Sequence, residues 1–337
     1  MDKKSFKEKS KKMKFTNDGV QNNTDVLYAG AYLSSNEIQQ FNENIDISIH
    51  RLDEKLGEME LDIKGIEAPI ANALRRVMIA EIPTMAIHKV SMFQNTSIIP
   101  DEVLCHRLGL IPIKADAFQF NEKRDEEENN ENNSIQFSLN IRCQRKKQYQ
   151  NKKDSELEGL NPEDYLENSV VYSSDLKWVP LGKQQEKFQE IKPVHEKIII
   201  AKLRENQEIC CDLICLKGIG RTHAKWSPVS TAFYRLMNDI QITKPIKGEK
   251  AKELKKLCPQ NVFDVEGGKA VVKNPRDCTV CRECIRLDQE FNEKIELGKD
   301  KEHYIFTIES VGIYTPEEIF KQALQMIKKK ALSYKIE

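Results

Sequence analysis

An amphipathic segment of the chain reads PIANALRRVMIAEIP from Pro69 to Pro83. Pro69 suits the first position of a helix, because its φ angle is already fixed there and its missing N–H needs no partner. The apolar residues that follow recur at helical spacing, and they are Ile70, Leu74, Val77, Met78 and Ile82. The spacing predicts a helix with one continuous apolar face that ends before Pro83.

A second segment of this kind reads TPEEIFKQALQMIKKKAL from Thr315 to Leu332. Thr315 can accept a hydrogen bond from a backbone N–H of the first turn, and Glu318 can reach back to form a capping box. The apolar positions are Ile319, Phe320, Ala323, Leu324, Ile327, Ala331 and Leu332. Two interpretations of both apolar stripes are open: they face the chain's own core, or they contact a partner.

The sequence between the two helices is rich in predicted strands. Strand-like runs cover 135–141, 196–203 and 208–216, and the short polar connection between the last two predicts a hairpin. The stretches 121–133 and 146–161 are too polar to supply a core, so we expect them to be surface insertions. The chain is therefore predicted to be α+β.

Charge and hydropathy exclude several classes of protein. The 53 Lys and Arg residues balance 53 Asp and Glu residues, so no global positive field attracts nucleic acid. The longest aliphatic run, 198–201, is far too short to span a bilayer, which argues against a membrane protein. The lysine-rich residues 1–40 lack an apolar signal-peptide core and predict a flexible tail in a chain that stays inside the cell.

Four of the nine cysteines stand in a pattern that favours a metal site. Cys258 is followed by proline, and 20 residues later begins the triplet Cys278, Cys281 and Cys284, with two residues between each cysteine and the next. Bacterial-type ferredoxins combine such a triplet with a remote Cys-Pro ligand. The position of a further ligand is occupied by Asp288, so only one cluster could be held.

Three interpretations of these cysteines are open: a [4Fe–4S] cluster, a zinc ion bound by the same four thiolates, or reduced thiols in a relic domain. In the first two cases we expect a structural role, because small metal domains gain folding energy from binding. The remaining cysteines are expected to be core residues, and they are Cys105, Cys143, Cys210, Cys211 and Cys215.

Several ordered blocks show a resemblance to a known family. The first runs NALRRVMIAEIPTMAI over 72–87, and PDEVLCHRLGLIP follows over 100–112. Later blocks are KGIG at 217–220, HAKWSP at 223–228 and IESVG at 308–312. Together they closely resemble the α-like subunit family of multisubunit RNA polymerases.

The resemblance implies a discontinuous dimerisation domain, here residues 41–92 and 300–337. It also implies an inserted strand-rich domain over 93–250, followed by a ferredoxin-like cysteine segment over 251–299 and preceded by the tail at 1–40. Blocks at 178–182 and 192–195 resemble the branch shared by RNA polymerases I and III. By resemblance, the third subunit of RNA polymerase II would carry a zinc-binding cysteine cluster near 116–133, and this sequence has no cysteine there. The alternative is the third subunit of RNA polymerase II.

The resemblance further implies that the two apolar stripes form part of the interface with a smaller α-like subunit. That pair would nucleate assembly of the large catalytic subunits in the nucleus, including the nucleolus, and would meet DNA and RNA only through the complex. The expected interface residues are Asn72, Leu74, Arg75, Arg76, Val77, Met78, Phe320, Leu324 and Ile327. For the two arginines, ordinary solvated side chains are the alternative.

No catalytic residue is expected in this chain. The histidines at 106, 195 and 223 are separated in sequence and have no evident Ser or Cys elbow beside them, and the sequence contains no phosphate-binding loop. An iron–sulfur electron-transfer protein is the competing functional class, but it rests on the cysteine segment alone and leaves most of the chain unexplained.

Overall fold

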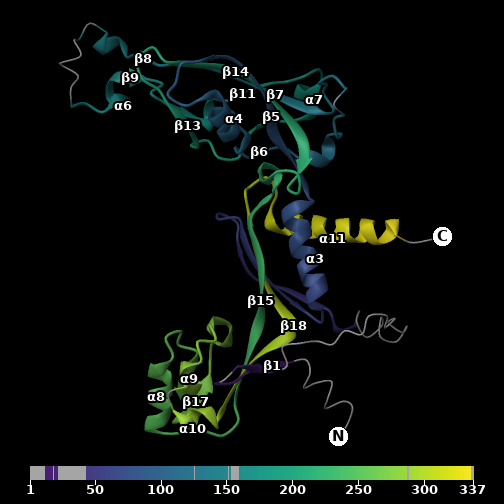
Figure 1. Cartoon of the computed structure of the whole chain (residues 1–337), viewed down its shortest axis with the longest axis vertical. Coiled ribbons are helices and arrows are strands. Elements are labelled where there is room, and N and C mark those ends of the chain that lie inside the picture. Colours follow the sequence, from purple (N-terminus) through teal and green to yellow (C-terminus); the bar gives the residue numbers. More distant parts are fainter. Residues whose placement is uncertain are drawn as a thin grey trace. The chain divides into compact units, whose positions relative to one another are not determined.

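The chain has a mixed α and β fold that divides into two compact units. The computed structural model describes residues 12–17, 19–21, 43–124, 126–150, 152, 159–286 and 288–334 (Figure 1). The first unit comprises Met1–Leu52, Met59–Ala73 and Phe233–Thr307, and the second comprises Asp53–Glu58, Leu74–Ala232 and Ile308–Glu337. Three elements are divided between the two units, namely α3 (Ala68–Ala80), β15 (Val229–Ile242) and β18 (Ile295–Ser310), and two strands, β3 (Asp46–Asp53) and β4 (Glu58–Lys64), have one terminal residue each in the second unit.

A single large sheet organises the first unit. Its further strands are β1 (Lys12–Phe15), β2 (Val20–Gln21), β3 (Asp46–Asp53) and β4 (Glu58–Lys64). The strand order is β2-β1-β18-β4-β3, and β15 also pairs with β18. In β4 the apolar Met59, Leu61 and Ile63 are buried while the alternating acids are only half-buried, as the period of two in a strand requires.

The prediction of a flexible tail is wrong for the tail residues that the structure describes. β1 pairs antiparallel with β18, and β2 pairs with β1. The Lys12 ammonium lies 2.7 Å from the Asp239 carboxylate, and that of Lys14 lies 2.7 Å from Glu296. These acids come from strands more than two hundred residues away, so the local composition gave no sign of them. The rest of the predicted tail lies outside the described residues.

The cysteine-bearing part of the first unit has its own small core. Its elements are α8 (Glu249–Leu257), β16 (Phe263–Glu266), β17 (Lys269–Val272), the 3₁₀ turn η5 (Pro275–Asp277), α9 (Glu283–Arg286) and α10 (Gln289–Asn292). Leu254, Phe263, Ile285 and Phe291 are buried in one cluster with Leu297. Because Leu297 belongs to β18, this cluster joins the cysteine-bearing part to the main sheet of the same unit.

The second unit contains a four-stranded antiparallel sheet. Its strands are β5 (Pro83–Asn95), β7 (Ser134–Arg142), β11 (Lys177–Val179) and β14 (Glu208–Ile219). The order is β11-β7-β14-β5, and α4 (Asp101–Gly109) contacts β5. Leu104 and Leu108 of α4 are buried in a core with Ile87, Phe137 and Leu213. β7 confirms the strand predicted over 135–141.

The predicted hairpin is wrong, although both of its strands exist. The first is β13 (Ile199–Lys202), which pairs with β10 (Val170–Tyr172), whereas β14 pairs with β5 on one edge and β7 on the other. Both edges of β14 are thus occupied. Asn206 turns the chain with φ 64° and donates its N–H to the Cys143 carbonyl, so the connection is bound to a third segment.

Both predicted long helices are confirmed. The second is α11 (Pro316–Ser333), where the Thr315 hydroxyl accepts from the Glu318 N–H and the Glu318 carboxylate accepts from the Thr315 N–H. Among the described residues, no helix combines the length and the apolar character needed to cross a bilayer. The smaller elements are β6 (Ile113–Lys114), η1 (Ala117–Gln119), β8 (Gln144–Arg145), η2 (Lys147–Tyr149), α6 (Pro162–Tyr165), β9 (Leu166–Glu167), η3 (Ser173–Asp175), α7 (Gln184–Lys187), β12 (Lys192–Pro193) and η4 (Ala224–Trp226).

The two compact units cut across the predicted domain boundaries. The predicted cysteine segment 251–299 falls within the first unit, while the predicted dimerisation domain, 41–92 and 300–337, contributes to both. The two compact units reflect packing within the chain, whereas a dimerisation domain is defined by the partner that it binds. The predicted boundaries therefore stay a prediction.

Candidate functional site

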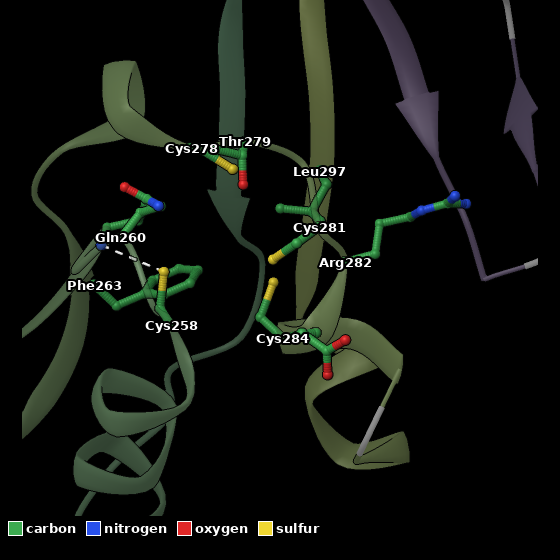
Figure 2. Close-up of a pocket in the computed structure, with 11 residues that line it drawn as sticks. Cys258, Gln260, Phe263, Cys278, Thr279, Cys281, Arg282, Cys284 and Leu297 are labelled. Carbon is green, nitrogen blue, oxygen red and sulfur yellow. Dashed lines mark hydrogen bonds between the residues drawn. The ribbon is translucent and has the colours of Figure 1, made fainter.

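The four cysteines singled out in the sequence line one pocket. Cys258 caps the C-terminal end of α8, Cys278 follows η5, Cys281 lies in the next turn and Cys284 belongs to α9. The pocket is narrow, with a cavity of about 20 Å³ that opens to solvent. Figure 2 shows the four side chains directed from these separate elements toward the same space. The remote Cys-Pro position and the triplet thus meet, as the sequence pattern predicts.

The backbone around the triplet is tightly turned. Val280 and Arg282 have φ angles of 55° and 66°, which is the left-handed region that side chains rarely adopt, β-branched ones least of all. The Val280 N–H donates to the Cys278 sulfur at 3.4 Å, and the Val262 N–H donates to the Cys258 sulfur at 3.5 Å. Such N–H donors favour the thiolate, which is the form that binds metals.

Burial opposes ionisation of these thiols in the chain by itself. It raises the pKa of the Cys284 thiol to about 12, and the nearby thiols of Cys278 and Cys281 add to the rise. Burial also raises the pKa of the Cys278 thiol, although the Val280 N–H counteracts part of that rise. A bound cation reverses this preference, because a coordinating thiol is deprotonated by the metal.

The four cysteines fit a metal group in their chemistry but do not stand at coordination spacing. Within the described ranges, no set of three or more His, Cys, Asp or Glu side chains is arranged to hold a metal ion. Four soft sulfur donors, two of them receiving N–H bonds, are nevertheless the donor set of an iron–sulfur cluster or zinc.

Asp288 stands where the ferredoxin pattern would have a further cysteine. Its carboxylate accepts from the Glu290 N–H at 2.8 Å and thereby caps α10, and it accepts from the Lys250 ammonium at 2.6 Å. These bonds lower the pKa of Asp288, with the bond from Lys250 the largest cause. The side chain therefore has a structural use where a second cluster would need a cysteine.

The other five cysteines were predicted to be core residues. Cys143, Cys211 and Cys215 are buried, which confirms the prediction for them, whereas Cys105 and Cys210 are half-buried. Burial raises the pKa of the Cys211 thiol to about 12, so this thiol is neutral and unreactive at physiological pH.

The interface residues predicted on α3 are mostly inside the chain. Leu74, Val77 and Met78 are only 3%, 4% and 0% exposed, so their side chains belong to the chain's own core. A role of these three residues in contacting a partner stays a prediction. Asn72 and Arg75 are half-buried, and Arg76 is exposed.

The interface residues predicted on α11 are more accessible. Leu324 is 41% exposed, while Phe320 and Ile327 are half-buried. The spacing continues in alternating steps of four and three to the exposed Ala331 and Tyr334. We call the residues 320, 324, 327, 331 and 334 the α11 stripe. The neighbouring Ile319 and Ala323 are fully buried, so the helix has one face on the core and an apolar stripe beside it.

The start of α11 is fixed in its own unit. The Tyr314 hydroxyl donates to the Pro83 carbonyl at 3.1 Å and accepts from the Ala117 N–H at 3.0 Å. Near the other end, the Lys330 ammonium pairs with the carboxylate of Glu81. The helix that carries the stripe is thus held at both ends before any partner binds.

Comparisons with known proteins show which family the sequence matches. The family described as RNA polymerase Rpb3/Rpb11 dimerisation domain matches residues 60–331. DNA-directed RNA polymerases I and III subunit rpac1 of Dictyostelium discoideum is 43% identical over 97% of this chain and 92% of its own length. The human protein of that name, RPAC1, is 40% identical over 92% of this chain and 90% of its own. DNA-directed RNA polymerase II subunit rpb3 of Dictyostelium discoideum is 30% identical over 80% of this chain and 87% of its own.

Proposed function

The chain belongs to the RNA polymerase Rpb3/Rpb11 dimerisation-domain family, and from this premise we propose that it is the α-like subunit of RNA polymerases I and III. The identity of 43% to the polymerase I and III relative, against 30% to the polymerase II relative of the same organism, supports this branch. The subunit is a non-catalytic scaffold of the enzyme, and its place of action is the nucleus, with the nucleolus as the site of polymerase I.

We infer that its first partner is a smaller α-like subunit. The observation that carries this inference is the α11 stripe, an apolar row at heptad spacing on a helix whose Ile319 and Ala323 are already buried in the core. Two helices that present such rows can pack along them, because residues at steps of four and three stay on one side of the helix. Arg76 is exposed on α3 and would add a polar contact to the partner.

The paired subunits would then provide the platform on which the large catalytic subunits assemble. The chain would contact DNA and RNA only indirectly, because it has a net charge of zero and several of the described lysines in the first unit are paired with acids. Catalysis would remain with the large subunits.

The cysteine pocket is proposed to hold a structural metal group. Cys258, Cys278, Cys281 and Cys284 would be its ligands, and the N–H groups of Val262 and Val280 would stabilise two of the thiolates. A [4Fe–4S] cluster is the preferred occupant, and a zinc ion or an empty relic site are the alternative outcomes of the test. When bound, the group supplies a crosslink between segments distant in sequence, which is folding free energy.

Anaerobic co-expression with the smaller α-like subunit tests both the pairing and the metal binding by the four cysteines. A stable pair that contains iron and sulfide near four per complex supports the partner and the cluster. A pair with zinc near one keeps the partner and replaces the cluster, whereas a pair without metal leaves a relic site. A chain that stays alone in the presence of the smaller subunit would overturn the scaffold role.

A further inference from the structure

The short loop that carries Cys278, residues 275–278, is held from one side by β15. The Asn238 side-chain amide donates to the carbonyl oxygens of Pro275 at 3.0 Å and of Cys278 at 2.8 Å. The Arg235 guanidinium donates to the carbonyl of Arg276 at 2.6 Å. Three carbonyls within four residues are therefore bound by side chains of one strand, which leaves the loop little freedom to move.

Arg276 ties the same loop to a second strand, β4. Two nitrogens of its guanidinium donate to the two carboxylate oxygens of Asp62, at 3.0 and 2.7 Å. Its Nε donates to Glu60 at 2.8 Å. A planar guanidinium matches a carboxylate in this two-bond geometry, which no other cationic side chain can reproduce. We call Arg276, Glu60 and Asp62 the arginine clamp.

The alternation of β4 explains why the clamp forms where it does. Met59, Leu61 and Ile63 are buried on one face of the strand, so Glu60 and Asp62 must point to the other. That face receives Arg276, and His303 of β18 also approaches Asp62, with its Nε2 at 3.1 Å from the carboxylate.

The clamp is mostly removed from water. The side chains of Arg276 and Asp62 are only 16% and 15% exposed. Burial alone would raise the pKa of Asp62, but hydrogen bonds from Arg276 and His303 outweigh it and lower the pKa, so the carboxylate is charged at neutral pH. Removal of one member of such a pair leaves a buried charge without its partner, which costs far more than the loss of a surface ion pair.

We propose that Arg276 is a positioning residue for the four-cysteine pocket: by fixing the loop 275–278 against β4, it keeps Cys278 beside the other three thiols and sets how long a bound metal group is retained. The inference rests on the metal-binding role proposed above. A group bound through Cys278 also holds the clamp closed, since coupling between two sites is reciprocal.

The test compares Arg276→Gln with Arg286→Gln in the complex with the smaller subunit. Arg286 is an exposed arginine two residues after Cys284, as Arg276 is two residues before Cys278, so it is a matched control. We measure the release of metal to an excess of chelator. Arg276→Gln is expected to release metal about tenfold faster, as for other residues that orient a metal ligand, and Arg286→Gln at the unaltered rate.

A second readout needs no metal. In metal-free complex, the alkylation rate of Cys278 relative to Cys281 is measured by mass spectrometry. Arg276→Gln is expected to raise this ratio, because the loop can then open, and Asp62→Asn is expected to reproduce the rise. If Arg276→Gln does not fold, Arg276→Lys retains the charge without the two-bond geometry and is expected to show the same changes to a smaller extent.

Equal behaviour of the Arg276 and Arg286 variants in both readouts would overturn the proposal. If the unaltered complex contains no metal, the metal-binding role fails, while the alkylation ratio still decides whether Arg276 positions Cys278. The two claims can therefore fail separately.

Discussion

The two long amphipathic helices, α3 and α11, carry equally clear apolar stripes in sequence but use them differently. On α3, Leu74, Val77 and Met78 are buried in the chain's own core. On α11, the core is met by Ile319 and Ala323, while Leu324 and Tyr334 of the α11 stripe remain open to solvent. A stripe therefore indicates that a helix packs against something, but not whether that surface belongs to the same chain.

A charge introduced into the α3 stripe should have the largest effect on the folded chain. Met78→Glu places a carboxylate at a fully buried position without a partner, so we expect a loss of roughly 4 kcal/mol in the free energy of unfolding. Thermal unfolding and soluble yield measure it. A Met78→Glu variant as stable as the unaltered chain would show that α3 is not core.

The same kind of change on α11 should spare the fold and abolish pairing. In Leu324→Glu with Ile327→Glu, both carboxylates enter the α11 stripe, and we expect the affinity for the smaller subunit to fall by at least about a hundredfold. Titration calorimetry measures the affinity, and thermal unfolding of the chain alone should change little.

Gln325→Glu is the control for that pair of changes, since it adds a carboxylate at the neighbouring exposed position outside the stripe. Pairing by this variant should be unaffected. Equal losses from stripe and control would mean that charge, rather than the stripe, determines binding.

The hydrogen bonds of Tyr314 at the start of α11 should have a third, smaller effect on stability. Tyr314→Phe removes the hydroxyl that bonds the Pro83 carbonyl and the Ala117 N–H, with an expected cost of about 1–3 kcal/mol. Burial is the main reason why the pKa of Tyr314 lies above its ordinary value of 10, so the folded state retains the proton longer than the unfolded state. The unaltered chain should therefore lose stability as the pH rises above 10, and Tyr314→Phe should lack this part of the decline, as measured by urea unfolding at several pH values.

Loss of the helix cap should be weaker still. Thr315→Ala removes the hydroxyl that accepts from the Glu318 N–H, so the free energy of unfolding should fall by about 1 kcal/mol. Thr315→Ser retains the hydroxyl and serves as the control in thermal unfolding. If alanine and serine are equivalent, the cap does not stabilise the helix.

The ion pair between Lys330 and Glu81 should contribute least. Lys330 is about half-exposed in this pair, so Lys330→Ala should change stability by less than about 1 kcal/mol. A larger loss in unfolding experiments would mean that the pair, and not Tyr314, holds α11 in place.

Local patterns predicted the elements of this chain well. The proline and capping signals located both long helices, and alternation located β7. The spacing of the cysteines identified the four side chains that share a pocket, because that spacing is itself a local signature.

Pairings between distant residues could not be predicted. The hairpin expected after residue 196 fails because β14 already has two neighbours, and β5 and β7 lie far from it in sequence. Arg276 and Asp62 are separated by 214 residues. Neither the local sequence around Arg276 nor the alternating acids of β4 predicts that these two side chains form an ion pair. Exposure of the α11 stripe likewise depends on which surfaces the rest of the chain covers.

Hydrogen exchange of the chain with and without the smaller α-like subunit tests the central claim most directly. The amides of α11, residues 316–333, should exchange much more slowly in the pair, while those of residues 74–80 in α3 should already be slow in the chain alone. Pairing that leaves α11 unchanged would contradict the assignment of its stripe as the partner surface.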